Sequence, residues 1–389
     1  MLGADTRQFR PIYNQKVAKN HRNTGCNRGR IATGRPERMK QSRFDFAIFG
    51  ASPLARLLAG LLSSVHGKTV LLQGQSQGVL RLARRLDLSV AAITRPETWA
   101  LLGSCVPQAT RLITRIGKRA AFARVDPIMF ADQPAGKQAL GHMRHMAAAH
   151  GLAAERAALE PGRDGVVLRD AVMLLRPVLD PALALWLTET GVRQLPAAAA
   201  VDILADGRAR CELGGETLEI GQTILADDDA ILAHLADDLW PALLQRQPAS
   251  AILTPPSDPL AAPVMYQLDS GLMLRQHAEG GLAAYGPGDI ADLARSLGGF
   301  LGKQDGFEQA GQSHFVRLVT SDGAPALGRV AGTGPDVLAG FGTIGAFLAP
   351  AIARWLCGQA SGPENDWFAA RLVNRNGDDG RVSDIGDPR

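Results

Sequence analysis

The sequence contains few of the residues that hold small secreted or metal-dependent proteins together. Its 389 residues include only four cysteines, Cys26, Cys105, Cys211 and Cys357, which are widely spaced and never form a C-x-x-C pair. This spacing argues against a zinc ribbon and a disulfide framework, and it suits a reducing compartment. We therefore expect a cytoplasmic protein.

Long apolar segments are also absent. Although 46% of the residues are hydrophobic, no run reaches the roughly 18 apolar residues that a membrane-spanning helix needs. A chain of this size and composition is typical of a soluble globular protein with two domains or two closely packed lobes. The sequence therefore predicts no membrane span.

Positive charge is concentrated in the first 38 residues. They hold nine Lys and Arg against two acidic residues, so the formal net charge of +4 for the whole chain leaves −3 on residues 39–389. A basic arm can bind nucleic acid or an anionic membrane, but this one lacks interleaved aromatics, helical periodicity and the apolar stretch of a signal peptide. We interpret residues 1–42 as a disordered basic extension. We expect translation to begin at Met39 and expect no nucleic-acid partner.

Three histidines lie close together in the sequence. His142, His145 and His150 lie on or near an expected helix, but no carboxylate or cysteine accompanies them at a spacing that suits a metal site. We interpret them as part of a solvated helix face. The sequence therefore predicts no metal site.

The first ordered part of the chain is expected to be a β-α-β unit. The apolar residues 44–50 are nearly continuous, which is typical of a buried parallel strand. A helix is expected over 54–65 and a second strand over 68–73, joined by a right-handed crossover.

The turn after the first strand resembles a dinucleotide fingerprint with one glycine replaced. The pattern G-x-G-x-x-G/A is met by Gly50 and Ala55, while Ser52 stands at the second glycine, where the backbone approaches the pyrophosphate. The helix N-terminus still offers N–H groups to an anion. The acidic residue expected about twenty positions later falls at the uncharged Gln73. An ordinary strand–helix junction can carry the same pattern, so this motif alone leaves nucleotide binding open.

The rest of the chain shows weaker local signals. We expect residues 79–150 to be mostly helical, with loops at Pro107 and Pro127. Further on, the patterns predict short strands over 200–203, 208–213, 216–220 and 222–226, a helix over 290–301, a strand over 336–340 and a helix over 346–356.

Two blocks near the C-terminus carry the most specific signal, HFVRLVTSDGAPALGRV (314–330) and PDVLAGFGTIGAFLAPAIARWLCG (335–358). They resemble the closing segment of FAD-dependent oxidoreductases of the D-amino-acid oxidase, glycine oxidase and sarcosine oxidase group. That segment typically contains R-P-x-T-x-D-G-x-P-x-[IL]-G, then a strand, G-x-G-x-x-G and a helix opening with A-P-A. Leu318 replaces the proline, and the matching positions are Arg317, Thr320, Asp322, Gly323, Pro325, Gly328, Gly340, Gly342, Gly345, Ala349, Pro350 and Ala351.

The resemblance implies an α/β fold in two parts. A Rossmann-like FAD-binding domain would comprise residues 43–78, 150–230 and 320–375. An α+β substrate domain with an antiparallel sheet would comprise residues 79–149 and 231–319, followed by a flexible tail over 376–389. The implied activity is oxidation of a small amine or amino acid to the imine, by hydride transfer to the flavin N5.

The resemblance also implies roles for particular residues. Arg317 would bind the substrate carboxylate through its fork of N–H donors, and Tyr266 would orient the carboxylate or amine. A structural salt bridge for Arg317 and core packing for Tyr266 stay open as alternatives. The residues expected to contact FAD are Gly50, Ser52, Ala55, Gln73, Gly328, Gly340, Gly342, Thr343, Ile344 and Gly345.

Three departures from the family pattern favour a second hypothesis. Asp227, Asp228 and Asp229 replace the family's A-[TA]-G-A after a strand, where negative charge would repel a pyrophosphate. As an alternative, these aspartates cap a helix that begins near Ala230. Ser52 and Gln73 are the other departures, and residues 74–78 are at most a remnant of the Ser/Gly-rich loop. The alternative function is a flavin-less or weakly flavin-binding homologue that serves as a structural or maturation subunit with a partner subunit.

Overall fold

The computed structural model describes residues 40–74, 82–160, 162–303 and 306–376. One part of its fold is a mixed eight-stranded sheet that contains β1. The expectations for residues 1–39, 75–81 and 377–389 lie outside the described residues. The sheet order is β17-β18-β11-β1-β2-β8, and β10 and β9 extend it beside β11. Pairing is parallel from β18 to β8 and antiparallel elsewhere. The strands are β1 (Lys40–Phe49), β2 (Val70–Gln73), β8 (Arg193–Leu195), β9 (Val201–Ile203), β10 (Ala209–Leu213), β11 (Glu216–Leu225), β17 (Ala326–Arg329) and β18 (Asp336–Ala339).

The end of β1 is buried on both faces of the sheet, as its continuous apolar run predicts. Phe46 and Ile48 pack into the core that includes the helices α1 (Pro53–Ser64), α4 (Arg176–Glu189) and α7 (Gly345–Leu356). Ala47 and Phe49 point to the opposite face and share a second core with α5 (Asp228–His234). This strand therefore positions the turn at Gly50 inside the protein.

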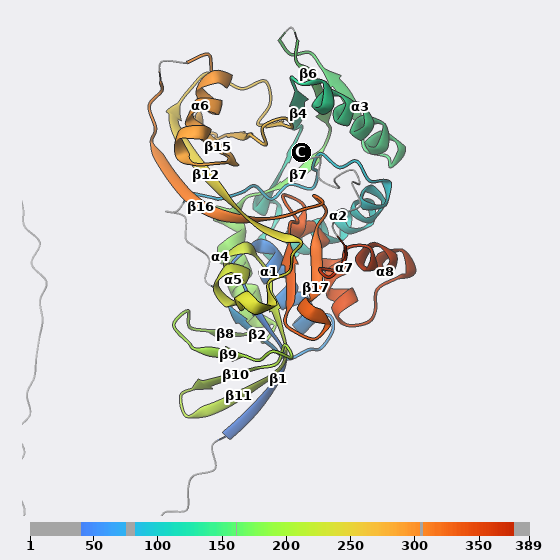
Figure 1. Cartoon of the computed structure of the whole chain (residues 1–389), viewed down its shortest axis with the longest axis vertical. Helices are drawn as coiled ribbons and strands as arrows, with labels where there is room; N and C mark the ends of the chain where they lie inside the picture. The colour runs from blue at the N-terminus through green and yellow to red at the C-terminus, as the bar shows by residue number, and fades with distance from the viewer. Residues whose placement is uncertain (1–39, 75–81, 161, 304–305, 377–389) are drawn as a thin grey trace, which may run out of the picture. The chain divides into compact units, whose positions relative to one another are not determined.

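A second, largely antiparallel sheet forms the other part of the fold. Its order is β16-β12-β15-β14-β13-β4-β6-β5, with one parallel pair, β13 and β4. Figure 1 shows the long strands β12 and β16 running together from this sheet toward the mixed sheet. The strands are β4 (Ile128–Ala131), β5 (Ala154–Ala157), β6 (Asp164–Leu168), β12 (Leu244–Pro256), β13 (Val264–Gln267), β14 (Met273–Gln276), β15 (Gly281–Pro287) and β16 (Gly311–Thr320).

The remaining elements complete the helical layer and the connections. Helix α2 packs against α4 and α7, and α8 packs against α2 and α7. Strands β3 and β7 form a separate two-stranded sheet. These elements are α2 (Pro96–Gly117), α3 (Pro134–Ala149), α6 (Ile290–Phe300), α8 (Gly362–Ala369), β3 (Phe122–Val125), β7 (Ala171–Leu174) and the 3-10 turns η1 (Arg119–Ala121), η2 (Asp237–Leu239) and η3 (Val330–Gly332).

The predicted fold class is confirmed: the chain is an α/β protein with a Rossmann-like sheet and a largely antiparallel sheet. The helical prediction for residues 79–150 is wrong in part, because β3 and β4 separate α2 from α3. A short apolar run cannot be assigned to a strand or a helix from periodicity alone. Pro107 lies inside α2, not in a loop.

The division into two domains stays a prediction. Within the range 150–230, β8 to β11 join the mixed sheet, whereas β5 and β6 pair with β4 in the antiparallel sheet. Among the described residues, no helix is long and apolar enough to cross a membrane.

Candidate functional site

The turn between β1 and α1, which the sequence predicts to be a dinucleotide-binding turn, has a glycine where the backbone requires one. Gly50 has a φ of +146°, and a Cβ atom at this position would lie 2.8 Å from a carboxylate oxygen of Asp227, so glycine is required. Pro53 occupies the first turn of α1, and the Ser52 hydroxyl accepts a hydrogen bond from the Ala55 N–H at 3.2 Å. Ser52 therefore acts as the N-cap of α1.

The N–H groups of this turn already have an anionic partner. One carboxylate oxygen of Asp227 accepts hydrogen bonds from Ala51 N at 2.7 Å and Ser52 N at 3.0 Å. The other oxygen accepts from Ala230 N at 3.0 Å and caps α5, which confirms the capping interpretation for this aspartate. Asp227 is 8% exposed. One buried carboxylate thus serves the N-termini of two helices.

The side chain of Gln73 is hydrogen-bonded to backbone carbonyl groups of the protein. Its side-chain amide donates to the carbonyl oxygens of Pro196 at 3.1 Å and Ala199 at 2.8 Å. The residue is 9% exposed. These contacts tie the end of β2 to the segment after β8 and occupy the amide nitrogen, while the buried Oε1 atom has no hydrogen-bond partner among the described residues.

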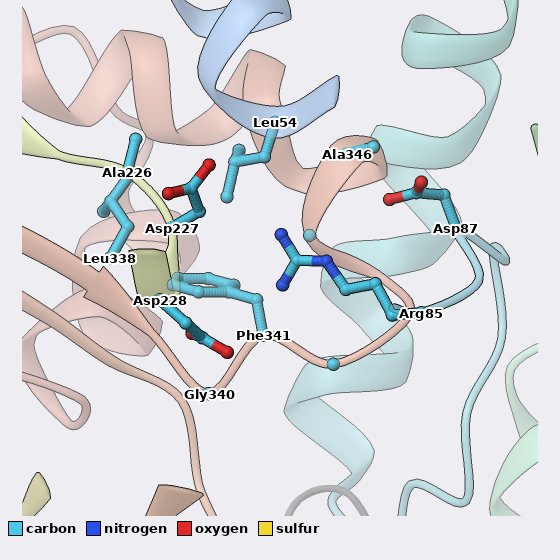
Figure 2. A pocket seen from close by; sticks show the side chains of 12 residues that line it. Leu54, Arg85, Asp87, Ala226, Asp227, Asp228, Leu338, Gly340, Phe341 and Ala346 are labelled. Carbon is cyan, nitrogen blue, oxygen red and sulfur yellow. The ribbon is translucent and has the colours of Figure 1, made fainter. Parts of the chain in front are cut away.

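Asp228 and Asp229 meet two arginines that sequence reasoning missed. Arg84 donates to both carboxylate oxygens of Asp229, at 2.6 and 2.7 Å. Figure 2 shows the guanidinium of Arg85 extending into a small pocket that Asp227, Asp228 and Phe341 also line. An acidic triplet at the end of a buried strand requires cations nearby. The two consecutive arginines at positions 84 and 85 are the sequence signal that could have identified these partners.

Burial and charge act against each other in this pocket. Burial raises the pKa of Asp228, and the two neighbouring aspartates add to that effect, while Arg85 opposes it. Burial acts to lower the pKa of Arg85, but Asp228 and the nearby carboxylates outweigh it and raise that pKa. Burial also raises the pKa of Asp87, against the pull of Arg176 and Arg85. The groove in front of α1 therefore carries charges of both signs instead of the neutral or positive surface that suits a pyrophosphate.

A cavity of about 1020 Å³ extends from this turn to the antiparallel sheet. Ala51 and Ser52 border it at the turn, and Gly340, Gly342 and Thr343 border it along the loop that precedes α7. Thr343 is tied down, since its hydroxyl donates to Val90 O at 2.9 Å and its carbonyl accepts from Leu88 N at 2.9 Å. The wall formed by the antiparallel sheet includes Met129, Tyr266, Met273, Tyr285, Phe315 and Arg317.

The two predicted catalytic residues line different stretches of this wall. Arg317 lies on β16, and its Nε donates to the side-chain oxygen of Gln247 at 2.7 Å. Tyr266 lies on β13, and three strands separate β13 from β16 in the sheet order. Tyr285, which sequence reasoning missed, lies between them on β15; burial raises its pKa to about 12, so its hydroxyl stays protonated at neutral pH. The catalytic roles of Arg317 and Tyr266 stay predictions.

The predicted glycine positions serve different purposes. Gly340 and Gly342 have φ values of +70° and +51° and shape the loop beside the cavity. Gly345 lets α7 approach α1, since a Cβ there would lie 3.1 Å from the Phe341 Cβ and 3.4 Å from Leu54. Gly345 and Gln73 are absent from the lining of the large cavity. The same is true of Ala55 and Ile344, which are fully buried, and of Gly328, which packs beneath Leu372.

The D-G-x-P turn of the C-terminal motif is stabilised by its own contacts. Both oxygens of Asp322 accept hydrogen bonds from Arg375, at 2.7 and 2.8 Å, and one also accepts from Ala324 N at 3.1 Å. The Thr320 hydroxyl donates to Ala324 O at 2.7 Å. Burial alone would raise the pKa of Asp322, but Arg375 and the backbone hold it below its usual value. The Thr320 and Asp322 positions of the motif are therefore explained by the contacts that hold this turn together.

FAD, the cofactor implied by the sequence resemblance, meets a different environment at each end of the cavity. At the loop from Gly340 to Gly345, the N-terminus of α7 has no side-chain cap and borders open volume, which suits the edge of a flavin ring. At the turn from Gly50 to Ala55, the N–H donors that bind a pyrophosphate are taken by Asp227. The residues at the pyrophosphate end, as they are arranged here, do not fit FAD.

The histidines that the sequence groups together lie on α3 or at its C-terminal end. Among the described residues, no three His, Cys, Asp or Glu side chains gather in a way that could hold a metal ion. His142 instead lies 2.9 Å from the carbonyl oxygen of Thr94 through its Nε2 atom.

No protein-family model and no curated protein matches the sequence. The fold, in contrast, is similar to that of many solved structures. These include glycine oxidase from Geobacillus kaustophilus, with 15% identity, 86% of this chain and 99% of that chain covered, and a TM-score of 0.66. L-proline dehydrogenase from P. horikoshii has 12% identity, coverage of 86% and 97%, and a TM-score of 0.68. Iminodiacetate oxidase from Chelativorans sp. BNC1 has 16% identity, coverage of 82% and 96%, and a TM-score of 0.59. The resemblance inferred from the sequence is thus confirmed as a likeness of fold to amino-acid oxidases and dehydrogenases.

Proposed function

We propose that the protein is an oxidoreductase that oxidises a small amine or amino acid and uses FAD, which it binds with low affinity. One observation carries this proposal: a single cavity of about 1020 Å³ joins Arg317 to the loop from Gly340 to Thr343. A cavity of this size accommodates a cofactor ring and a small substrate together. The fold by itself does not determine an activity, so the proposal depends on the residues that line this cavity.

The cavity wall offers the groups that such a substrate needs. Gln247 holds Arg317 through its Nε. Within the described part of the chain, the terminal N–H groups of the guanidinium are available to meet a carboxylate in a forked geometry. Tyr285 presents a hydroxyl that remains protonated, so it can donate a hydrogen bond. Met129, Met273 and Phe315 supply apolar surface around these groups. This combination favours a small carboxylate bound against an otherwise apolar wall.

The test compares Arg317→Ala with Arg210→Ala, an exposed arginine of β10 that is absent from the cavity lining. Binding of glycine, L-proline and iminodiacetate is measured by calorimetry, and oxidation is followed with added FAD. Removing one partner of a charged hydrogen-bonded pair costs about 2 kcal/mol or more, so Arg317→Ala should lose at least ~30-fold in affinity or raise KM by that factor. Equal binding by both variants would show that Arg317 does not bind the carboxylate.

A second candidate function is the flavin-less subunit, and the position of Asp227 favours it. A carboxylate that satisfies the N–H groups of α1 makes the turn stable without a dinucleotide. Under this hypothesis the purified full-length protein is colourless, shows no quenching of FAD fluorescence at tens of micromolar FAD, and turns over none of the three substrates. A flavin spectrum that survives gel filtration would exclude it.

A further inference from the structure

We infer that Asp227 occupies the place of the cofactor's pyrophosphate and closes the dinucleotide groove in the resting protein, so that FAD binds only by displacing it. This inference rests on the proposed function, because it concerns how FAD enters the same site. Its physical basis is the pair of hydrogen bonds from Ala51 N and Ser52 N to one Asp227 oxygen. Those N–H groups, at the N-terminus of α1, are the donors that an anion would use.

Capping of α5 alone does not account for this arrangement. The cap needs only the oxygen that accepts from Ala230 N, whereas the second oxygen reaches a turn that is 175 residues away in the sequence. The fit is close, since a Cβ at Gly50 would lie 2.8 Å from that second oxygen. A carboxylate supplies both acceptors and a full negative charge, as a phosphate does. Asp227 is therefore an internal anion for the α1 turn.

The neighbouring residues hold the closed arrangement in place. Arg84 donates hydrogen bonds to both carboxylate oxygens of Asp229. The next residue, Arg85, lines the small pocket together with Asp228. Figure 2 shows Asp227, Asp228 and Arg85 around this pocket. Phosphate groups entering here meet three aspartates. Of the two arginines that could attract them, Arg84 is paired with Asp229 and Arg85 lines the same small pocket as Asp228. Closure thus has a hydrogen-bonded part at Asp227 and an electrostatic part beside it.

The substitution that tests this inference is Asp227→Asn. Asparagine keeps the shape of the side chain and is a good N-cap, so α5 is preserved. It has one acceptor oxygen instead of two and no charge, so it cannot satisfy both helices. The matched control is Asp238→Asn, which removes the same charge from an exposed position on η2 that does not line the cavity.

The first measurement is a titration of each full-length protein with FAD, followed by quenching of flavin fluorescence. We expect Asp227→Asn to bind FAD at least about tenfold more tightly than the wild type, because charge-assisted hydrogen bonds no longer have to be broken. Asp238→Asn should match the wild type. Equal dissociation constants for all three proteins would overturn the inference and leave the proposed function standing.

The second measurement needs no cofactor. Amide hydrogen exchange at Ala51 and Ser52 should be slow in the wild type and at least about tenfold faster in Asp227→Asn, since the acceptor of both N–H groups is lost. Exchange in α7 serves as an internal reference for global stability. Unchanged protection of the two amides would refute closure by Asp227. If the amides respond but neither protein binds FAD, closure stands and the FAD-dependent function is refuted.

Discussion

The carboxyl group of Asp336 gives a stability prediction that can be worked from the structure. Asp336 begins β18, is 4% exposed, and accepts a hydrogen bond from the Gln222 side-chain amide at 2.9 Å. Burial raises its pKa from 3.8 to about 6, although Arg329 and Gln222 act in the opposite direction. The folded protein therefore favours the protonated acid, and ionisation at neutral pH destabilises it.

The direction and size of the effect follow from proton linkage. Between pH 4 and pH 6 the folded state binds a proton that the unfolded state has released, so the free energy of unfolding falls as the pH rises through this window. A difference of about two pKa units corresponds to about 3 kcal/mol. The whole of this loss is present above pH 6, and it disappears below the unfolded pKa. Asp336→Asn keeps an oxygen that can accept from Gln222, and it should stabilise the protein at pH 7.5 by up to about 3 kcal/mol.

Urea unfolding monitored by circular dichroism at several pH values between 4 and 8 measures this effect. We expect the curves of wild type and Asp336→Asn to diverge as the pH rises and to meet near pH 4. Asp202→Asn is the control, because Asp202 is an exposed residue on β9 of the same sheet. A variant that is less stable than the wild type at pH 7.5, or that keeps the same pH dependence, would refute the reasoning.

Two further predictions concern packing and the C-terminal turn. Asp322→Ala should lower the free energy of unfolding by about 3 kcal/mol because it leaves Arg375, only 14% exposed at its side chain, without its carboxylate; an unchanged urea midpoint would contradict this. Gly60→Ala should lose about 1–3 kcal/mol, because the new methyl group would lie 2.1 Å from the ring of Trp186. Gly103→Ala, in α2 with nothing within 4 Å, should gain about 0.5–1 kcal/mol instead, and equal effects of the two substitutions would show that Trp186 adjusts freely.

Several features of the fold could be predicted from the sequence because they depend on neighbouring residues. The apolar run before Gly50 and the Ala/Leu-rich run after it predict β1 and α1 within a few residues. The glycines from 340 to 345 similarly predict the loop before α7. Periodicity and turn residues involve only a few neighbouring positions, so the sequence contains all the information that predicts these elements. The same argument fails for β4, which is a strand because β13 and β6 pair with it.

The candidate site shows where the sequence stops being sufficient. The sequence showed that Ser52, Gln73 and the acidic triplet depart from the family pattern, and it left open whether the aspartates repel a phosphate or cap a helix. The tertiary structure brings Asp227 to the N–H groups of Ala51 and Ser52, and it places Arg85 beside Asp228. These partners are separated by more than a hundred residues in the sequence, and the parallel pairing of β1 with β11 brings Asp227 to the turn that follows β1. Local patterns determine the helices and strands of this protein, while the carboxylate that caps the turn after β1 reaches it only when β1 and β11 pair.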